Sequence, residues 1–391
     1  MNRLQIWPEG ITEQEGLLTT GFVLEDVQGT RTRGWYRLPA GLREAITESC
    51  DPFVLAALFT AMQTPADLQV HGTVSPSLLK NLEEFQAIWH AWLPARYQPV
   101  EILAESEQEA GQAAGSPAIM TFSGGLDSSF TAWRHCTGQA GRQTEALQAG
   151  VILHGFDIPI KSEKAFEHAY ERSRLMLDSL GMETIPMANN LRGLGGDYAD
   201  CHAAILASCL SLLQKRFSVG LIANSRPNFV LIHPWGLPYG SNSLSDRFLS
   251  SNAFTIQHDG AGYSRFDKAQ ALSGWSEAMS NLRVCLGHNP LVRVRNCCKC
   301  EKCIRNILTF RVLGLGLPAC FKHDVSNRQI LSMSYDNPMH FSFFNQILEE
   351  AHQRGIRASW VRALRLSILS NHILLPFRRS EFFHRLVSRL K

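Results

Sequence analysis

The sequence predicts an α/β protein built on an open parallel sheet with helices on both faces. From residue 118 to residue 223, short apolar runs alternate with stretches of helical length. This alternation is the pattern of parallel strands joined by crossover helices. The first apolar run leads into two adjacent glycines, Gly124 and Gly125, which is typical of a turn from a buried strand into a helix. We expect a small α+β domain before this sheet and a helical segment after it.

The N-terminal domain, residues 1–105, is expected to combine a hairpin, two helices and a short strand. Two runs rich in aromatic and branched residues flank a polar stretch with a glycine, which predicts the hairpin. Ser75 and Pro76 suit the cap and first position of the second helix. In chain order we expect these elements at 21–25, 34–38, 51–62, 76–92 and 100–103. Residues 106–117 are small, acidic and aperiodic, which predicts a linker.

The central domain, residues 118–315, is expected to hold the parallel sheet. Its predicted strands are 118–122, 149–154, 183–187 and 217–223. Its predicted helices begin at 127, 162 and 198. Ligands of open α/β sheets bind beyond the carboxyl ends of the strands. We therefore expect functional residues directly after the strands, at Ser123–Gly125, His154–Asp157 and Asn224–Arg226.

The turn of residues 123–126 is the predicted phosphate-binding loop. Two glycines let the backbone approach a ligand, and the N–H groups and dipole of a helix start favour an anion. The hydroxyls of Ser123, Ser128 and Ser129 can add donors, and Asp127 can cap the helix or hold magnesium on phosphates. A di- or triphosphate fits this chemistry, and a tight turn without any ligand is the alternative.

A cluster of cysteines predicts a metal site near the end of the central domain. The spacing is C-x2-C-x2-C with a further cysteine upstream, which suits one tetrahedral zinc with a structural role. The expected ligands are Cys285, Cys297, Cys300 and Cys303. Cys298 has poor spacing for a ligand, and His288 is a second candidate for the fourth position. A metal-free cluster and an iron–sulfur cluster are the alternatives.

Charge and composition indicate the expected compartment of the protein and a possible contact surface at its C-terminal end. The chain has ten cysteines, no apolar run of membrane-spanning length and no signal peptide at its first residues, so we expect a cytoplasmic protein without a membrane span. Residues 316–391 are expected to form a helical, basic C-terminal extension. From Arg354 to Lys391 there are nine basic residues and one acid. This segment is either a solvated helical tail or a docking surface for an acidic partner, nucleic acid or anionic lipid.

The loop sequence SGGLDS, residues 123–128, resembles the pyrophosphate loop Ser-Gly-Gly-x-Asp-Ser/Thr of the N-type ATP pyrophosphatases. Together with CCKCEKCIR at 297–305, it resembles the 7-cyano-7-deazaguanine (preQ0) synthase family over about residues 117–315. The resemblance implies an adenine nucleotide alpha-hydrolase-like fold. It also implies that Lys268, in the segment FDKA, helps to bind ATP. The catalytic residues expected from it are Ser123, Asp127, Ser128 and Lys268. The expected nucleotide contacts are Ser123, Gly124, Gly125, Leu126, Asp127, Ser128, Ser129 and His154.

What the resemblance implies about chemistry is an ATP-dependent carbon–nitrogen ligase. Members of the family split ATP between the α and β phosphates and transfer AMP to the carboxylate of 7-carboxy-7-deazaguanine. Ammonia then gives an amide and, after a second activation, a nitrile. The implied cofactors are ATP, Mg²⁺ and Zn²⁺, and the implied assembly is a homodimer.

The chain also departs from that family. It carries more than a hundred additional residues in front and about seventy-five behind. The family's substrate segment Tyr-x-Asp-Cys-Arg is absent from 231–251, where Tyr239 to Arg247 is only loosely similar. This segment combines flat rings with polar groups, so we expect it to bind a planar heterocycle. Its expected contacts are Trp235, Tyr239, Asp246 and Arg247.

These departures suggest that the protein still activates a carboxylate with ATP but passes the acyl group to a different acceptor. Enlarged synthase-like proteins occur in bacterial antiphage systems, where similar enzymes attach a deazaguanine to the N-terminal amine of a partner protein. Two alternatives remain open. One is a tRNA-modifying enzyme of the same superfamily, with nucleic acid as partner, and the other is a non-catalytic nucleotide-binding module of a defence complex.

Overall fold

The computed structural model describes residues 3–111, 115–225, 239–285, 295–335 and 338–378. The chain divides into two compact units. The first consists of residues 1–268 with 290–292, and the second of residues 269–289 with 293–391.

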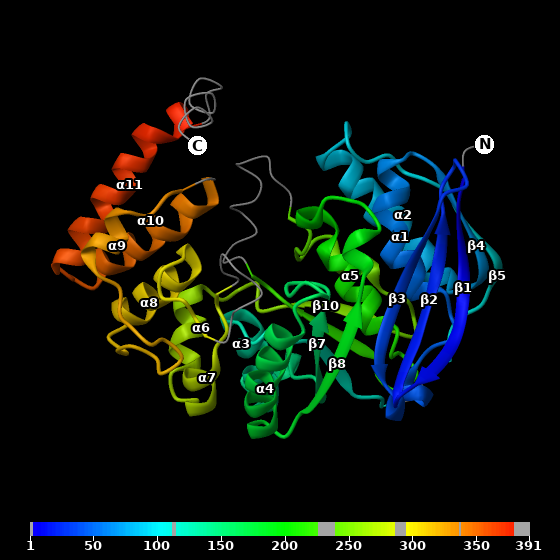
Figure 1. Cartoon of the computed structure of the whole chain (residues 1–391), viewed down its shortest axis with the longest axis horizontal. Helices are drawn as coiled ribbons and strands as arrows, with labels where there is room; N and C mark the ends of the chain where they lie inside the picture. The colour runs from blue at the N-terminus through cyan, green and yellow to red at the C-terminus, as the bar shows by residue number, and fades with distance from the viewer. Residues whose placement is uncertain (1–2, 112–114, 226–238, 286–294, 336–337, 379–391) are drawn as a thin grey trace. The chain divides into compact units, whose positions relative to one another are not determined.

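The first unit is organised around one sheet of ten strands, most of which pair in parallel (Figure 1). The strand order is β10-β9-β6-β7-β8-β3-β2-β1-β4-β5. The strands are β1 (Arg3–Gln14), β2 (Leu17–Glu25), β3 (Arg31–Pro39), β4 (Asp67–Val74), β5 (Ile102–Glu107), β6 (Ala118–Thr121), β7 (Leu147–His154), β8 (Glu183–Asn189), β9 (Val219–Ala223) and β10 (Thr255–Asp259).

Five strands form the parallel half of this sheet and confirm the expected open parallel arrangement. β6 lies between β7 and β9, with Ile119 paired to both Ala149 and Gly220. The chain runs outward from β6 to β7 and β8, and then returns to the other side of β6 for β9 and β10. The strand order therefore changes direction between β6 and β9. Such a switch point opens a crevice at the carboxyl ends of the strands.

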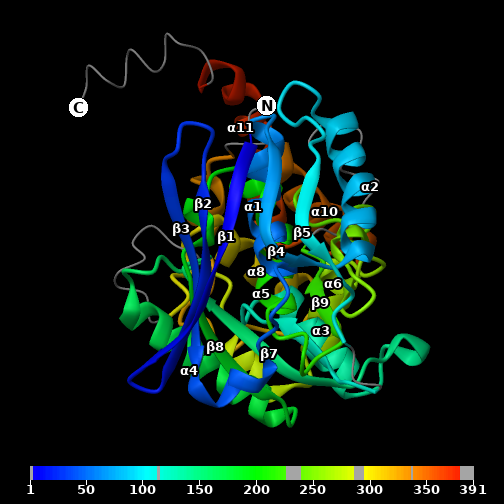
Figure 2. The same ribbon diagram turned by 90° about the vertical axis from the view of Figure 1, so that its right-hand side faces the viewer.

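The N-terminal half of the sheet contains the expected hairpin and two strands that the sequence pattern did not predict. β2 and β3 pair antiparallel, as expected. β1 and β4 are the additional strands, and they pair with each other in parallel. Figure 2 shows β3, β2, β1, β4 and β5 side by side. β3 joins the two halves through the pair Tyr36 and Asn189 of β8. The segments on either side of the expected 106–117 linker thus share one sheet.

Helices cover both faces of the parallel strands, as the alternating pattern predicts. They are α3 (Leu126–Cys136), α4 (Glu163–Ser179) and α5 (Tyr198–Ser211). The helices of the N-terminal half are α1 (Asp51–Gln63), which packs on β1, β2 and β4, and α2 (Pro76–Trp92). α4 packs so closely on β7 that a Cβ added at Gly150 would lie 2.6 Å from a methyl of Leu177. The hydroxyl of Ser208 on α5 donates to the carbonyl of Pro52 on α1 (2.6 Å) and hydrogen-bonds to the hydroxyl of Tyr36 on β3 (2.6 Å). This buried network ties the N-terminal elements to the parallel half.

The second unit is helical in the part that the structure describes. Its helices are α7 (Ser276–Asn281), α8 (Glu301–Val312), α9 (Asn327–Leu331), α10 (Pro338–Gln353) and α11 (Ser359–Arg378). α6 (Arg265–Leu272) begins in the first unit and ends in the second. A buried Tyr335 stacks on Phe344 and meets Phe341 edge-on, which gives α10 an aromatic contact with the segment after α9. Among the described residues, no helix has the length and hydropathy needed to cross a bilayer.

Candidate functional site

The predicted loop lies at the switch point of the sheet, between the end of β6 and the start of α3. Gly124 has φ of +70°, a left-handed conformation that glycine adopts without strain. Gly125 is the residue that precedes the first helical turn of α3. Ser123 is exposed, and Gly125 is half-buried. The loop therefore presents its backbone and one hydroxyl at the edge where ligands of such sheets bind.

Two serine hydroxyls hold the loop in this conformation. The Ser123 N–H donates to Oγ of Ser128 at 3.3 Å, and the two hydroxyls are 3.1 Å apart. The Gly125 N–H donates to Oγ of Ser123 at 3.3 Å. These distances lie at or beyond the long end of normal hydrogen bonds. An anion that approached the loop could replace them at small cost.

Ser129 differs from the other predicted donors. It is fully buried, and its hydroxyl makes no hydrogen bond to the residues that the structure describes. Its backbone N–H donates to the carbonyl of Gly125 as part of the helix start. The structure therefore places Ser129 in the core beneath the loop, away from the exposed position of Ser123.

Asp127 is held between two cations from α6. Its Oδ1 accepts from Nζ of Lys268 at 3.0 Å, and its Oδ2 accepts from the guanidinium of Arg265 at 3.1 Å. The Lys268 side chain is only 2% exposed and that of Asp127 18%. Asp127 thus anchors two positive charges beside the loop, and its expected contact with magnesium stays a prediction.

The start of α6 explains how Lys268 reaches this position. The hydroxyl of Ser264 accepts from the N–H of Asp267 at 3.2 Å, while the Asp267 carboxylate accepts from the N–H of Ser264 at 2.8 Å. This reciprocal cap fixes the first turn of α6, from which Arg265 and Lys268 project. Nζ of Lys268 also donates to the carbonyl of Asn224, directly after β9.

Sequence reasoning found Lys268 through a family resemblance and missed Arg265. The signal that could have found Arg265 is local: a Ser-x-x-Asp cap at residues 264–267 places basic residues three positions apart in one helical turn. No local signal identifies the partner of Arg265, because Asp127 is 138 residues earlier in the chain.

A second carboxylate, which is buried, holds α3 through contacts with three of its side chains. Asp259, at the end of β10, accepts from Thr131 at 2.7 Å and from His135 at 3.2 Å, and lies 3.4 Å from the guanidinium of Arg134. Burial raises the pKa of Asp259, but the hydrogen bonds and the charge of Arg134 outweigh this and hold the pKa below its ordinary value of 3.8. The anionic Asp259 therefore fixes the helix whose first turn carries the loop.

His154 ends β7 at the same edge of the sheet, where the sequence placed it. Its ring stacks on Phe166, and Nε2 donates to the carbonyl of Pro159 at 3.1 Å. Its own carbonyl accepts from the side-chain amide of Asn189 at 3.2 Å. Burial lowers the pKa of His154 below its ordinary value of 6.5, against the opposing effect of the Pro159 carbonyl. The imidazole is thus neutral and held by its surroundings, and contact of this strand end with a nucleotide stays a prediction.

Asp246, expected in a heterocycle-binding segment, is instead a structural carboxylate. It is fully buried, and it accepts from the Ser241 hydroxyl at 2.8 Å, the Asn242 N–H at 3.0 Å and Nδ1 of His258 at 2.8 Å. These bonds fold the segment that precedes β10 onto that strand. Arg247 is exposed beside it.

Tyr239 borders a group of aromatic side chains at the same edge of the sheet. Its ring lies 4.6 Å from that of His202 on α5, and its hydroxyl accepts from Ser225 at 3.4 Å. Arg226 and Trp235, which were also expected near this site, and His288, the second candidate for the fourth metal ligand, lie outside the described residues.

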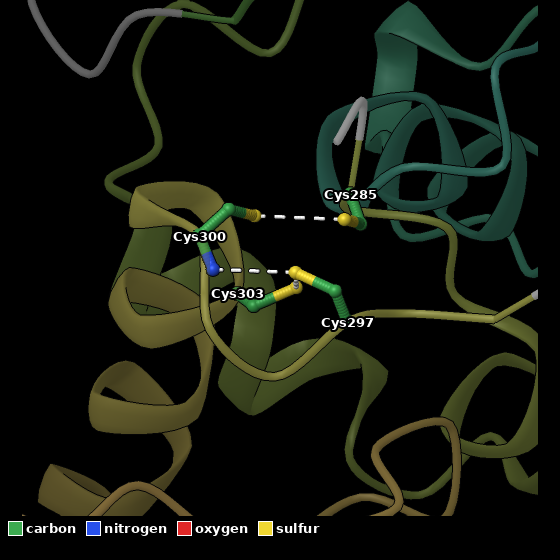
Figure 3. A group of neighbouring side chains, drawn as sticks. All are labelled: Cys285, Cys297, Cys300 and Cys303. Carbon is green, nitrogen blue, oxygen red and sulfur yellow. Dashed lines mark hydrogen bonds between the residues drawn. The ribbon is translucent and has the colours of Figure 1, made fainter. Parts of the chain in front are cut away.

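The four predicted cysteine ligands converge in the second unit (Figure 3). Their sulfurs all lie within 4.8 Å of one another, with Cys285 and Cys300 3.5 Å apart and Cys297 and Cys303 3.8 Å apart. Four sulfurs at 2.3 Å around a tetrahedral zinc would be separated by about 3.8 Å. None of the four forms a disulfide. This cluster can hold a metal ion.

Local backbone geometry explains the convergence. Cys300 precedes the first residue of α8 and Cys303 lies in its first turn, where N–H groups and the helix dipole favour thiolates. The N–H of Cys300 donates to the sulfur of Cys297 at 3.2 Å. The buried side chain of Asn296 accepts from the N–H groups of Val284 and Cys285 at 3.1 and 3.3 Å. It thereby fastens the upstream ligand to the other three.

Cys298 takes no part in the cluster, as its spacing predicted. It has φ of +56°, and its thiol lies 3.6 Å from the carbonyl of Asn296. The thiols of the cluster lie within hydrogen-bond distance of one another. Hydrogen bonds from Cys300 and Cys303 lower the pKa of Cys285, and the bond to Cys285 raises the pKa of Cys300 to about 12.

Comparisons with models of protein families, with curated proteins and with solved structures found no match to this chain. Its own residues and their arrangement are therefore the basis for a functional assignment.

Proposed function

We propose that this chain is an ATP-dependent carbon–nitrogen ligase that forms AMP and pyrophosphate. In this proposal it activates a carboxylate of the 7-carboxy-7-deazaguanine type and passes the acyl group to an amine. The amine is ammonia or the N-terminal amine of a partner protein, and with a protein acceptor the reaction would be similar to that of the enlarged family members in antiphage systems.

One observation carries the nucleotide part of the proposal. The SGGLDS loop lies at the switch point of a parallel sheet, and α6 brings Lys268 and Arg265 to its Asp127. A glycine turn, a helix N-terminus and two cations form a site suited to a polyphosphate. The two cations share one carboxylate, Asp127, and positive charge beside a glycine turn favours an anionic ligand.

The proposed reaction has two steps. A carboxylate oxygen attacks the α-phosphorus of ATP, and the bond from that phosphorus to the β-phosphate oxygen breaks, which gives an acyl adenylate and pyrophosphate. The amine then attacks the acyl carbon, AMP leaves, and the amine releases a proton. Backbone N–H groups of residues 123–125 and the Ser128 hydroxyl would stabilise the charge that moves onto pyrophosphate, while Lys268 and Arg265 neutralise it. Mg²⁺ would reach the site bound to the phosphates of ATP.

The cysteine cluster has a separate role in this proposal. We assign it Zn²⁺, because four thiolates at this spacing form a closed tetrahedral site that leaves no position for a substrate. Such sites stabilise a fold and do not perform chemistry.

The test is release of AMP and pyrophosphate by the purified full-length chain with ATP and Mg²⁺. We expect release to depend on 7-carboxy-7-deazaguanine and the product to appear when ammonium is added. Stimulation by tRNA instead would favour a tRNA-modifying enzyme. ATP binding without release under any of these conditions would favour a nucleotide-binding module.

Two variants connect the activity to the loop. Ser123→Ala removes an exposed hydroxyl and Asp127→Asn removes the charge that anchors α6, so both should lower AMP release at least 100-fold. Thr137→Ala, at the other end of α3, is the matched control, because its hydroxyl bonds only to the carbonyl of Trp133 and should leave the rate unchanged. Equal AMP release by Ser123→Ala, Asp127→Asn and the parent protein would exclude the loop from the mechanism.

A further inference from the structure

The last described helix, α11, has an apolar stripe on its outer face. Leu366, Leu369 and Ile373 are 57%, 56% and 58% exposed. At 100° per residue, these three side chains and that of Arg362 fall within an arc of about 60°. Isolated exposed leucines are common on protein surfaces, but an aligned row on one helix indicates a contact surface.

The opposite face of α11 fixes the helix in the second unit. Trp360, Leu364 and Ile368 are buried there. The amide of Asn371, also buried, donates to the carbonyl of Met333 at 2.9 Å and accepts from the N–H of Tyr335 at 3.1 Å. α11 is thus apolar on two sides. In the part of the second unit that the structure describes, the inner side is buried and the outer side is exposed. The outer stripe is held in place by the packing of the inner one.

Basic side chains flank the outer stripe. Arg362 and Arg365 are both exposed on this part of α11. The chain from Arg354 to its last residue has nine basic residues and one acid, Glu381. The occupant of the stripe must therefore accept aliphatic side chains at its centre and supply negative charge around them.

These two requirements discriminate among the possible occupants. Nucleic acid would satisfy the arginines but would leave three aliphatic side chains against phosphates and water. A second copy of the chain would cover the stripe but would bring the same excess of positive charge to the contact. An anionic lipid surface accepts both groups, because the aliphatic side chains enter the boundary of the acyl chains while the arginines meet the headgroups.

We propose that the outer face of α11 docks the protein on the surface of a membrane that contains anionic phospholipid. The helix lies on such a surface and does not cross it. This inference does not depend on the proposed ligase activity.

Sedimentation of the full-length chain with vesicles tests the proposal. The vesicles are phosphatidylcholine alone, or phosphatidylcholine with one quarter phosphatidylserine. We expect binding to the mixed vesicles, at least tenfold weaker binding to phosphatidylcholine alone, and weaker binding as salt concentration rises.

Two sets of substitutions separate the apolar and charged contributions. The triple variant Leu366→Gln, Leu369→Gln and Ile373→Gln should lower the partition coefficient at least tenfold, and Arg362→Gln with Arg365→Gln should lower it severalfold. Leu175→Gln is the matched control, since Leu175 is 48% exposed on α4 and should bind as the parent does. Circular dichroism should show unchanged unfolding of all variants, because each substituted side chain faces solvent.

Several outcomes would overturn the proposal. They are absence of vesicle binding by the parent protein, binding that the triple variant retains, and equal binding to both kinds of vesicle. A dimer of the parent chain that the triple variant loses in sedimentation velocity would identify a second copy as the occupant instead. Binding to tRNA or DNA that only the arginine substitutions weaken, without vesicle binding, would identify nucleic acid.

Discussion

The SGGLDS loop and the cysteine cluster are both built at the start of a helix, but they are completed in different ways. The loop contributes its own hydroxyls and N–H groups, and its charges come from α6, 138 and 141 residues later in the chain. The cluster takes three of its four ligands from seven consecutive residues, and the fourth is 15 residues from Cys300.

This difference decides which site depends on a ligand for its stability. Lys268, the most buried of these charges, is already paired with Asp127 within the protein, so the fold of the first unit does not require a ligand at the loop. The four sulfurs lie close together, with distances of 3.5 and 3.8 Å for two of the pairs, and as thiolates they would repel one another. We therefore expect metal removal to destabilise the second unit, and ATP removal to leave the first unit folded.

The largest effect is expected from Cys300→Ser. Loss of one thiolate from a four-thiolate site should abolish stoichiometric metal binding, and structural zinc contributes on the order of 10 kcal/mol in small zinc domains. Metal analysis and thermal unfolding should show loss of zinc together with a lower unfolding temperature of the second unit, and a chelator should reproduce the effect on the parent protein. A stable Cys300→Ser protein with a full equivalent of zinc would contradict this comparison.

A smaller effect is expected from Asp127→Ala. This change leaves Lys268, whose side chain is 2% exposed, without its carboxylate partner, which should cost about 3 kcal/mol. Asp127→Asn keeps an acceptor and should cost less. Urea unfolding at neutral pH measures both. If the Lys268→Met substitution fails to restore the stability of Asp127→Ala, the unpaired lysine is not the cause.

A third test concerns pH and Asp259. Its pKa in the folded protein lies below its ordinary value, so its contribution to stability is present above about pH 4 and is lost as pH falls through the lower folded pKa. Asp259→Asn should cost about 1–3 kcal/mol at pH 7, as expected for hydrogen bonds to a charged group. Urea unfolding at pH 7 and pH 3 should show a smaller difference between parent and variant at pH 3. A difference independent of pH would show that ionisation of Asp259 is not involved.

The smallest effect is expected from Cys298→Gly. Glycine would relieve the left-handed conformation at φ of +56°, a gain of about 1 kcal/mol, and would lose the contacts of a buried thiol. The two effects oppose each other, so the free energy of unfolding should change by less than about 1 kcal/mol. Zinc content should remain at one equivalent, which makes this variant the control for Cys300→Ser. Loss of zinc on this substitution would instead place Cys298 among the ligands.

The sequence predicted those parts of the fold in which a short segment has a clear apolar pattern of its own. Residues 118–122 and 149–154 are apolar runs, and the structure has β6 and β7 there. β1 was missed because most of its residues are exposed or half-buried, which leaves no regular apolar pattern. β4 was missed because Gly72 stands where the alternation of Leu68, Val70 and Val74 requires an apolar side chain.

The candidate sites were likewise predictable only where their residues are close together in the sequence. Spacing identified Cys297, Cys300 and Cys303, because ligands so close in sequence can reach one ion with few backbone choices. Cys285 was the expected fourth ligand, with His288 as a second candidate, and the structure brings Cys285 to the other three. The Ser241, Asn242 and His258 contacts of Asp246 could not be foreseen, since a carboxylate in a polar segment looks the same in sequence whether it meets a ligand or is buried.

By itself, the sequence determined β6, β7, β8 and β9, the helices α3, α4 and α5 between them, the glycine turn and the cysteines that converge, but not β10. Each of these depends on residues within a few turns of one another. Only the tertiary structure decided that β3 joins β8 in a single sheet, that Lys268 and Arg265 hold Asp127, and that Asp246 is buried. These pairings join residues that are distant in the chain, and they form because a buried charge or an open strand edge must find a partner when the chain folds.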